Sequence, residues 1–157
     1  MSLNPNSLYI LLHVVASVVW VGGMVFAHKC LRPVAADLLE PPQRLTLWVG
    51  VFANFFPLVW ISVVLLLSTG FTMVYSIWGG MAEAPLHIHI MAGFGILMML
   101  VFMYVFFSPY KKLKAAVLAQ QWPAGAEALA KIRQLVGFNI LVGLFVLVVA
   151  SAGRYLI

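Results

Sequence analysis

The stretch Leu8–Leu31, LYILLHVVASVVWVGGMVFAHKCL, decides the fold of this chain. It is long enough to cross the hydrocarbon core of a bilayer, which is about 30 Å thick and takes about 20 apolar residues as a helix. It nevertheless contains His13 near one end and His28 near the other. An ionisable side chain inside a membrane is costly, so each histidine is a candidate functional residue once a partner is identified.

The composition extends this conclusion to the whole chain. Of its 157 residues, 64% are hydrophobic and 8% are charged, whereas about a quarter of the residues of a soluble domain are charged. The net charge of +5 does not indicate a nucleic-acid partner, because the basic residues lie between apolar stretches, where they set membrane topology. The length predicts a single domain, residues 1–157. The single Cys30 excludes an internal disulfide, and the first apolar run is too long for a cleaved signal peptide.

Four apolar stretches reach the spanning length. They are residues 8–31, 47–78, 86–108 and 135–156. We expect each to be a helix, because backbone polar groups inside a bilayer must be satisfied within the segment itself. The predicted fold class is therefore an all-α, integral membrane four-helix bundle, with the lipid bilayer as its first partner.

The basic residues predict the orientation. Of the nine Lys and Arg residues, all except Arg154 lie on one side, in the first and third loops. The positive-inside rule makes this side cytoplasmic, so both termini face outward. We expect the chain in the cytoplasmic (inner) membrane of a bacterium. The lysine-rich segment between the third and fourth spans is predicted to be a basic helical hairpin that breaks at residues 122–125.

Histidines on two spans are expected at a similar depth in the outer half of the bundle. The third span enters from the side of His13 and carries His87 and His89 in its first two turns. These two differ by about 200° around a helix, so only one of them faces inward. We favour His89, which shares its face with small residues, and keep His87 as the alternative. Two imidazoles facing each other across a bundle are the axial ligands of a b-type haem, so the pattern predicts haem b between the first and third spans.

Three further residues are candidates for the same haem site. Trp20 follows His13 along its helix, and Gly70 of the second span lies in the same outer half. Arg154 lies near the outer surface, where it would bind haem propionates. A protein of this kind transfers electrons, and any enzymatic activity would be that of an oxidoreductase. A quinone or a redox protein is a candidate partner, and a homo-oligomer is left open.

Copper is the main alternative to haem. The segment His87-Ile88-His89-Ile90-Met91 supplies two imidazoles and a thioether, which are ligands that suit copper. A helix would place the two histidines on opposite faces, so this site requires the segment to be extended.

The second histidine of the first span, His28, has no other histidine at its depth. Near the inner side we expect it to join a hydrogen-bonded polar cluster with side chains of other spans, and a second cofactor or substrate site is the alternative. The candidates are Asn54, Asn139, and Tyr104 or Tyr110.

Three short motifs resemble a known family. His13 followed by Trp20-Val21-Gly22-Gly23 resembles the opening of CopD-like membrane proteins and of the related HemJ-type protoporphyrinogen oxidases. Leu86-His87-Ile88-His89 is similar to the Leu-His-x-Lys start of a later HemJ-type helix, and Phe138-Asn139 to an element of its last helix. The resemblance implies a four-helix-class membrane protein in which His13 ligates haem. It also implies copper transport or copper resistance as the CopD-like alternative, and His89 in place of the lysine favours a second axial ligand over porphyrinogen oxidation.

Overall fold

The computed structural model describes residues 5–156, apart from the side chains of Pro5, Arg154 and Leu156. Within these residues every regular element is helical. In chain order they are α1 (Pro5–Val25), the π-helix η1 (Phe26–Leu31), α2 (Arg32–Leu38), α3 (Pro41–Trp78), the short 3₁₀-helix η2 (Met81–Glu83), α4 (Leu86–Phe107), α5 (Pro109–Leu118) and α6 (Trp122–Leu156). Four continuous helical stretches are long and apolar enough to cross a membrane. The predicted all-α architecture with four spanning helices is confirmed.

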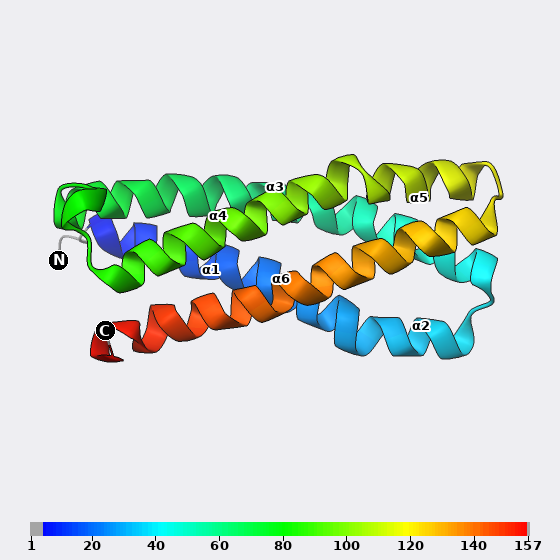
Figure 1. Ribbon diagram of the computed structural model, residues 1–157, viewed down its shortest axis with the longest axis horizontal. Coiled ribbons are helices and arrows are strands. Elements are labelled where there is room, and N and C mark those ends of the chain that lie inside the picture. Colours follow the sequence, from blue (N-terminus) through cyan, green and yellow to red (C-terminus); the bar gives the residue numbers. More distant parts are fainter. Residues whose placement is uncertain (1–4, 157) are drawn as a thin grey trace.

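The bundle consists of two helix pairs. α1 packs along α3, and α4 packs along α6, while α6 also contacts α1 and α3 and so joins the pairs. Figure 1 shows the long helices side by side, with both ends of the chain at the same end of the bundle. The chain reverses direction at this end between α3 and α4, and at the other end before α3 and before α6. α1 and α4 therefore belong to different helix pairs, and each packs mainly against the other helix of its own pair.

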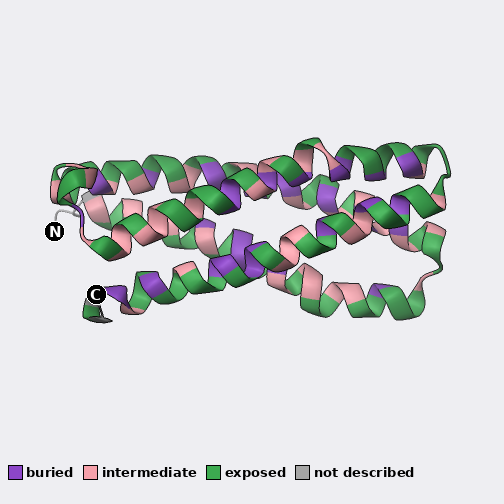
Figure 2. Cartoon of the chain, in the orientation of Figure 1, coloured by how far each residue is buried: buried purple, intermediate pink, exposed green. Residues whose placement is uncertain are grey.

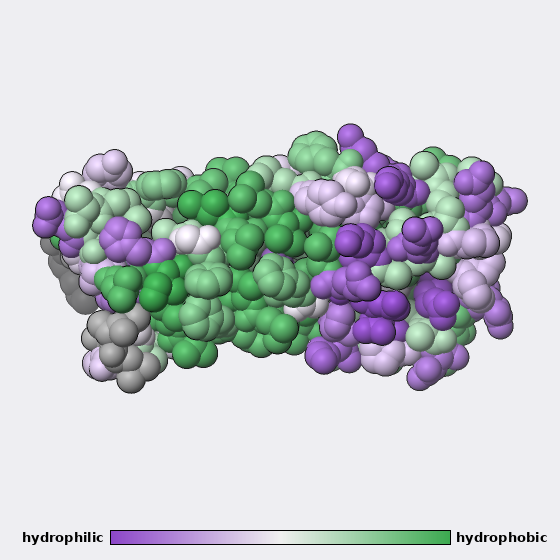
Figure 3. Space-filling model, viewed as in Figure 1, coloured by the Kyte–Doolittle hydropathy of each residue, from purple (hydrophilic) through white to green (hydrophobic). Residues whose placement is uncertain are grey.

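The helices extend further at the end opposite the termini than the apolar stretches predict. α1 continues through η1 and α2 as far as Leu38, and α3 begins at Pro41 rather than near residue 47. A proline is tolerated in the first helical turn, and a capping box formed by Glu40 and Gln43 stabilises this start. Figure 3 shows a broad hydrophobic band over the middle of the bundle and hydrophilic residues gathered around α2 and α5. The helical extensions thus form a polar end beyond the membrane-spanning part.

The segment between the third and fourth spans is a helical hairpin, as predicted. α4 ends at Phe107, α5 begins at Pro109, and the chain reverses at residues 119–121, where Gln120 has a φ of 55°. The predicted break at residues 122–125 was wrong by a few positions, because Pro123 lies in the first turn of α6, where the missing N–H costs no helical hydrogen bond. The cytoplasmic location of this hairpin and the N-out, C-out orientation stay predictions.

Aromatic rings fill the middle of the bundle, where Figure 2 shows buried segments of several helices facing one another. Phe52 and Phe56 of α3 stack with their centroids 5.0 Å apart, and Tyr110 of α5 meets Phe56 edge-on at 4.8 Å. On the other side, Trp20 of α1 meets Phe102 of α4 edge-on at 6.1 Å. Since lipid removes the hydrophobic drive for helix association, such close packing carries much of the stability. This core separates the end of the bundle that holds His13, His87 and His89 from the end that holds the arginines of the first and third loops.

Candidate functional site

His13 lies on the face of α1 that packs against α3. Its Nδ1 atom is 2.7 Å from the hydroxyl oxygen of Thr69. A Cβ atom placed on Gly70 would lie 3.3 Å from Cε1 of the His13 ring. Gly70 therefore provides the space in which the imidazole is seated against α3, and Thr69 fixes its rotation.

The hydrogen bonds of Thr69 determine the tautomer of His13. The Thr69 hydroxyl lies within hydrogen-bond distance of the carbonyl oxygen of Leu65, one turn earlier. A hydroxyl has a single proton to donate, and a carbonyl can only accept. Thr69 therefore donates to Leu65 and accepts from His13 Nδ1–H, which leaves the Nε2 lone pair of a neutral His13 available. A hydrogen bond that orients an imidazole in this way is characteristic of metal-ligating histidines.

The two histidines of α4 have opposite environments. His87 is half-buried. It packs against Gly153 of α6, where an added Cβ atom would lie 2.9 Å from the Cβ atom of His87. The Nδ1 atom of His87 is buried and has no hydrogen-bond partner in the described structure. His89, by contrast, is exposed. The expectation that His89 shares the inward face and His87 the lipid face was wrong, because Gly153 lets α6 approach α4 on the His87 side.

A packing layer in the middle of the bundle allows the depths of these histidines to be compared. A Cβ atom on Gly143 of α6 would lie 2.9 Å from Val21 of α1 and 3.1 Å from Met98 of α4. At 1.5 Å per residue, His13 lies about 12 Å from Val21 along α1, and His87 lies about 17 Å from Met98 along α4. The two imidazoles therefore lie in the same half of the bundle, next to the chain ends, about one helical turn apart in depth and on different helix pairs.

The extended conformation that the copper alternative requires at His87-Ile88-His89-Ile90-Met91 does not form. α4 is helical from Leu86 onward, so His87 and His89 diverge around the axis. Met91 follows His87 by four residues, which puts the imidazole and the thioether on one face. Both side chains are half-buried. The helix thus replaces the predicted His–His–Met set by a His–Met pair.

The remaining candidates from the sequence are placed as follows. Trp20 is buried in the core, with 3% of its surface exposed, and Gly70 lies against His13. The side chain of Arg154 lies outside the part of the chain that the structure describes. No group of three or more His, Cys, Asp or Glu side chains that could hold a metal ion occurs among the described residues. The ligand roles of His13, His87 and His89 stay predictions.

The polar cluster expected around His28 is not formed by the described side chains. Asn54 and Tyr104 are exposed, Tyr110 lies in the aromatic core, and Asn139 donates instead to the carbonyl oxygen of Met98 at 3.1 Å. His28 lies in the π-helix and packs on Gly137 of α6, where an added Cβ atom would lie 3.5 Å from the ring. π-helical turns are frequent at functional sites. This turn directs His28 toward α6.

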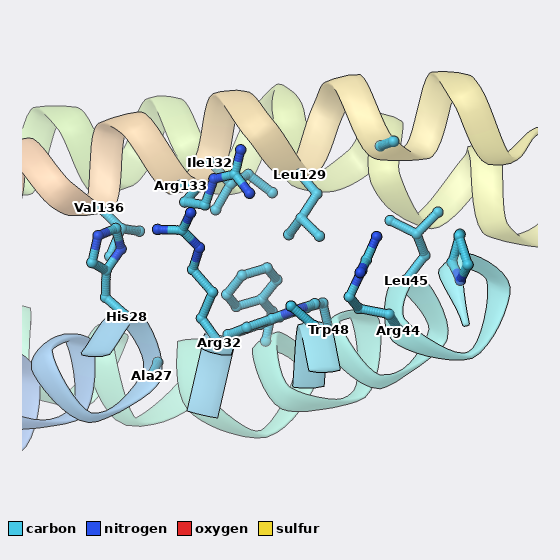
Figure 4. A pocket seen from close by; sticks show the side chains of 14 residues that line it. Ala27, His28, Arg32, Arg44, Leu45, Trp48, Leu129, Ile132, Arg133 and Val136 are labelled. Atoms are coloured by element: carbon cyan, nitrogen blue, oxygen red, sulfur yellow. The ribbon is translucent and has the colours of Figure 1, made fainter. Parts of the chain in front are cut away.

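A cavity of about 310 Å³ opens beside His28, and no motif in the sequence indicates it directly. Three arginines line it, namely Arg32, Arg44 and Arg133. Figure 4 shows Arg32 extending from its helix toward α6 beside His28, with Arg133 on α6 above it. The arginines are far apart in the chain, so their convergence depends on the packing of α2, α3 and α6. By sequence alone, the basic residues of the first loop are interpreted only as topology determinants.

These features define a class of protein: a multi-pass membrane protein with four spanning helices and imidazoles seated in the half of the bundle next to the chain ends. The family model of copper resistance protein D, CopD, matches residues 49–152, which is more than half of the chain. The chain belongs to the copper resistance protein D family. The matched region includes His87 and His89 but begins after α1, so the resemblance at His13 and the HemJ-type resemblance stay predictions. No curated protein and no solved structure matches the chain.

Proposed function

We propose that this protein binds copper as cargo at the outer end of the bundle, in the service of copper tolerance or transport. The observation that carries the proposal is the buried Nδ1 atom of His87, which has no hydrogen-bond partner in the described structure. A ring nitrogen shielded from water without a partner is costly, and such atoms mark functional sites. A ring nitrogen of a neutral imidazole can instead coordinate a metal ion through its lone pair.

The donor types around His87 favour copper over other metals. Met91 presents a thioether on the same helical face, and His13 offers Nε2 because Thr69 occupies its Nδ1. Imidazole and thioether donors without carboxylates suit Cu(I). Family membership supports the same metal. The proposed ligand set is His87 and Met91 of α4, with His13 of α1 as a further donor.

The test compares two histidines that differ in burial but lie two residues apart. Detergent-purified wild type and the variants His87→Ala and His89→Ala are loaded with Cu(I), and bound copper is measured per chain. We expect His87→Ala to lower the affinity by about tenfold or more, the scale on which even outer-shell changes act, and His89→Ala to bind as the wild type does. Equal binding by wild type and His87→Ala contradicts the proposal, as does a loss confined to His89→Ala.

A b-type haem is a second candidate, favoured by one observation: His13 and His87 lie in the same outer half on different helix pairs. Bound there, haem would supply one-electron chemistry, and His13, whose Nε2 is left free by the hydrogen bond of Nδ1 to Thr69, would be one of its ligands. The visible spectrum of the same samples separates the candidates. Sharp bands of a reduced low-spin haem at near-unit stoichiometry, lost in His13→Ala, would establish the haem protein and exclude copper cargo at this site.

A further inference from the structure

The cavity between α2, α3 and α6 combines positive charge with apolar walls. Arg32, Arg44 and Arg133 line it together with Trp48 and Ile132. Figure 4 shows the indole of Trp48 lying below the space into which the arginines extend. The volume of about 310 Å³ falls in the range of small-molecule sites. A ligand that fits both kinds of surface has an anionic group and an apolar body.

The protein supplies no counter-ion for these arginines within the residues that the structure describes. Three acidic residues lie at this end of the bundle, namely Asp37, Glu40 and Glu127. All three are exposed, and none lines the cavity. Arg133 lies within electrostatic range of both Arg32 and Arg44, so the three positive charges repel one another in the absence of a ligand. An anion bound among them would remove this repulsion.

The depth of the cavity matches the headgroup layer of the leaflet next to the basic end. Arg32 lies about 40 Å along the helix from Pro5, which equals the bilayer thickness with headgroups included. Arg133 lies about 30 Å from Gly153 along α6, which equals the thickness of the hydrocarbon core. Figure 3 shows the hydrophobic band of the surface ending where the hydrophilic region around α2 and α5 begins. A phosphate group in the cavity would therefore lie at the level of lipid phosphates.

We propose that this cavity is a binding site for one anionic phospholipid, whose phosphate lies among Arg32, Arg44 and Arg133 and whose acyl chain follows the apolar wall toward the core. Arginine suits this role because its planar guanidinium binds phosphate through two parallel hydrogen bonds. Basic pockets between membrane helices recognise lipid headgroups in the same way. The apolar wall runs from Leu45 and Trp48 to Val136. The site lies at the opposite end of the bundle from His13 and His87, so the proposal does not depend on copper binding.

The test measures lipid retention by native mass spectrometry of the protein released from nanodiscs of equal parts phosphatidylglycerol and phosphatidylcholine. We expect the wild type to retain one phosphatidylglycerol per chain. Replacing Arg32, Arg44 and Arg133 by Gln together should lower this retention by about a hundredfold, since each arginine near a membrane surface contributes about fivefold and the three factors multiply. The matched control replaces Lys111, Lys112 and Lys114 of α5 by Gln. It removes the same charge from exposed positions at the same end and should retain the lipid.

Two further samples keep the outcome decisive if the triple arginine variant unfolds. Arg133→Gln alters one exposed side chain and should lower retention about fivefold. Ala126→Trp leaves every charge in place but fills the cavity from α6, and it should also release the lipid. Equal losses in the lysine control and the arginine variant would overturn the proposal in favour of diffuse surface attraction. Displacement of the lipid by inorganic phosphate alone would overturn it in favour of a site for a free anion.

Discussion

The Nδ1 atom of His13 on α1 donates a hydrogen bond of 2.7 Å to the hydroxyl of Thr69 on α3, which in turn donates to the carbonyl of Leu65. This short chain fixes both the ring orientation and the tautomer of a histidine inside a membrane. His13 also rests on Gly70, as His28 rests on Gly137 and His87 on Gly153. Three of the four histidines therefore occupy spaces that glycines of neighbouring helices leave open. The fourth, His89, is exposed.

Replacing Thr69 by Val should weaken metal binding by His13 without disrupting the helix pair. Valine has nearly the same shape but cannot accept a hydrogen bond from Nδ1–H, so the tautomer that leaves the Nε2 lone pair free is no longer favoured. We expect a loss of affinity for Cu(I) of about tenfold and a loss of stability of about 1 kcal/mol. Thr72→Val is the control, because the Thr72 hydroxyl is exposed and bonds only to the carbonyl of Ser68. Unchanged copper binding in Thr69→Val would exclude the orienting role of Thr69.

Replacing Gly143 by Ala should destabilise the contact between the two helix pairs. The new Cβ would lie 2.9 Å from Cγ2 of Val21 and 3.1 Å from Cε of Met98. The flexible Met98 side chain can move, but the β-branched Val21 is stiff, so the helices must shift at a cost of about 1–3 kcal/mol.

Gly93→Ala is the matched control for this change. A Cβ atom there meets nothing within 4 Å, and alanine is favoured over glycine in a helix by about 0.5–1 kcal/mol. Denaturant titration of both variants in the same detergent should show a lower midpoint for Gly143→Ala and an equal or higher one for Gly93→Ala. Equal midpoints would show that Gly143 does not set the distance between the pairs.

The number and type of the spanning helices follow from the sequence because a bilayer admits few alternatives for runs of this length. The positions at which the helices end on the basic side of the bundle do not follow from the sequence in the same way. Residues 32–38 are helical but polar enough to resemble a loop, and their helicity depends on continuation from the helical segment before them, which they contact. Likewise Pro123 suggests a chain break by its type, and only its position in the first turn of α6 makes it compatible with a helix.

The histidine site can be predicted in part from the sequence, because the bilayer makes polar residues inside apolar runs conspicuous. An ionisable residue inside an apolar run is visible in any sequence, which is why His13 and the pair His87 and His89 stand out. Which member of that pair faces the protein depends on Gly153, far along the chain in α6. The arginine cavity depends on three helices meeting, and no local pattern indicates that Arg133 lies close to Arg32 and Arg44.

The single cysteine of the chain provides a direct test of the predicted orientation. Cys30 is exposed on the π-helix, next to Lys29 and close to Arg32 at the basic end of the bundle. If the basic end is cytoplasmic, a membrane-impermeant maleimide should label Cys30 in permeabilised cells but leave it unlabelled in intact spheroplasts. The companion variant carries Cys30→Ser together with Ser7→Cys, at the other end of α1. It should be labelled in intact spheroplasts, because both ends of the chain lie at the opposite end of the bundle (Figure 1). The reverse labelling pattern would invert the topology and place the outer histidines on the cytoplasmic side. It would then require copper to enter the proposed site from the cytoplasm.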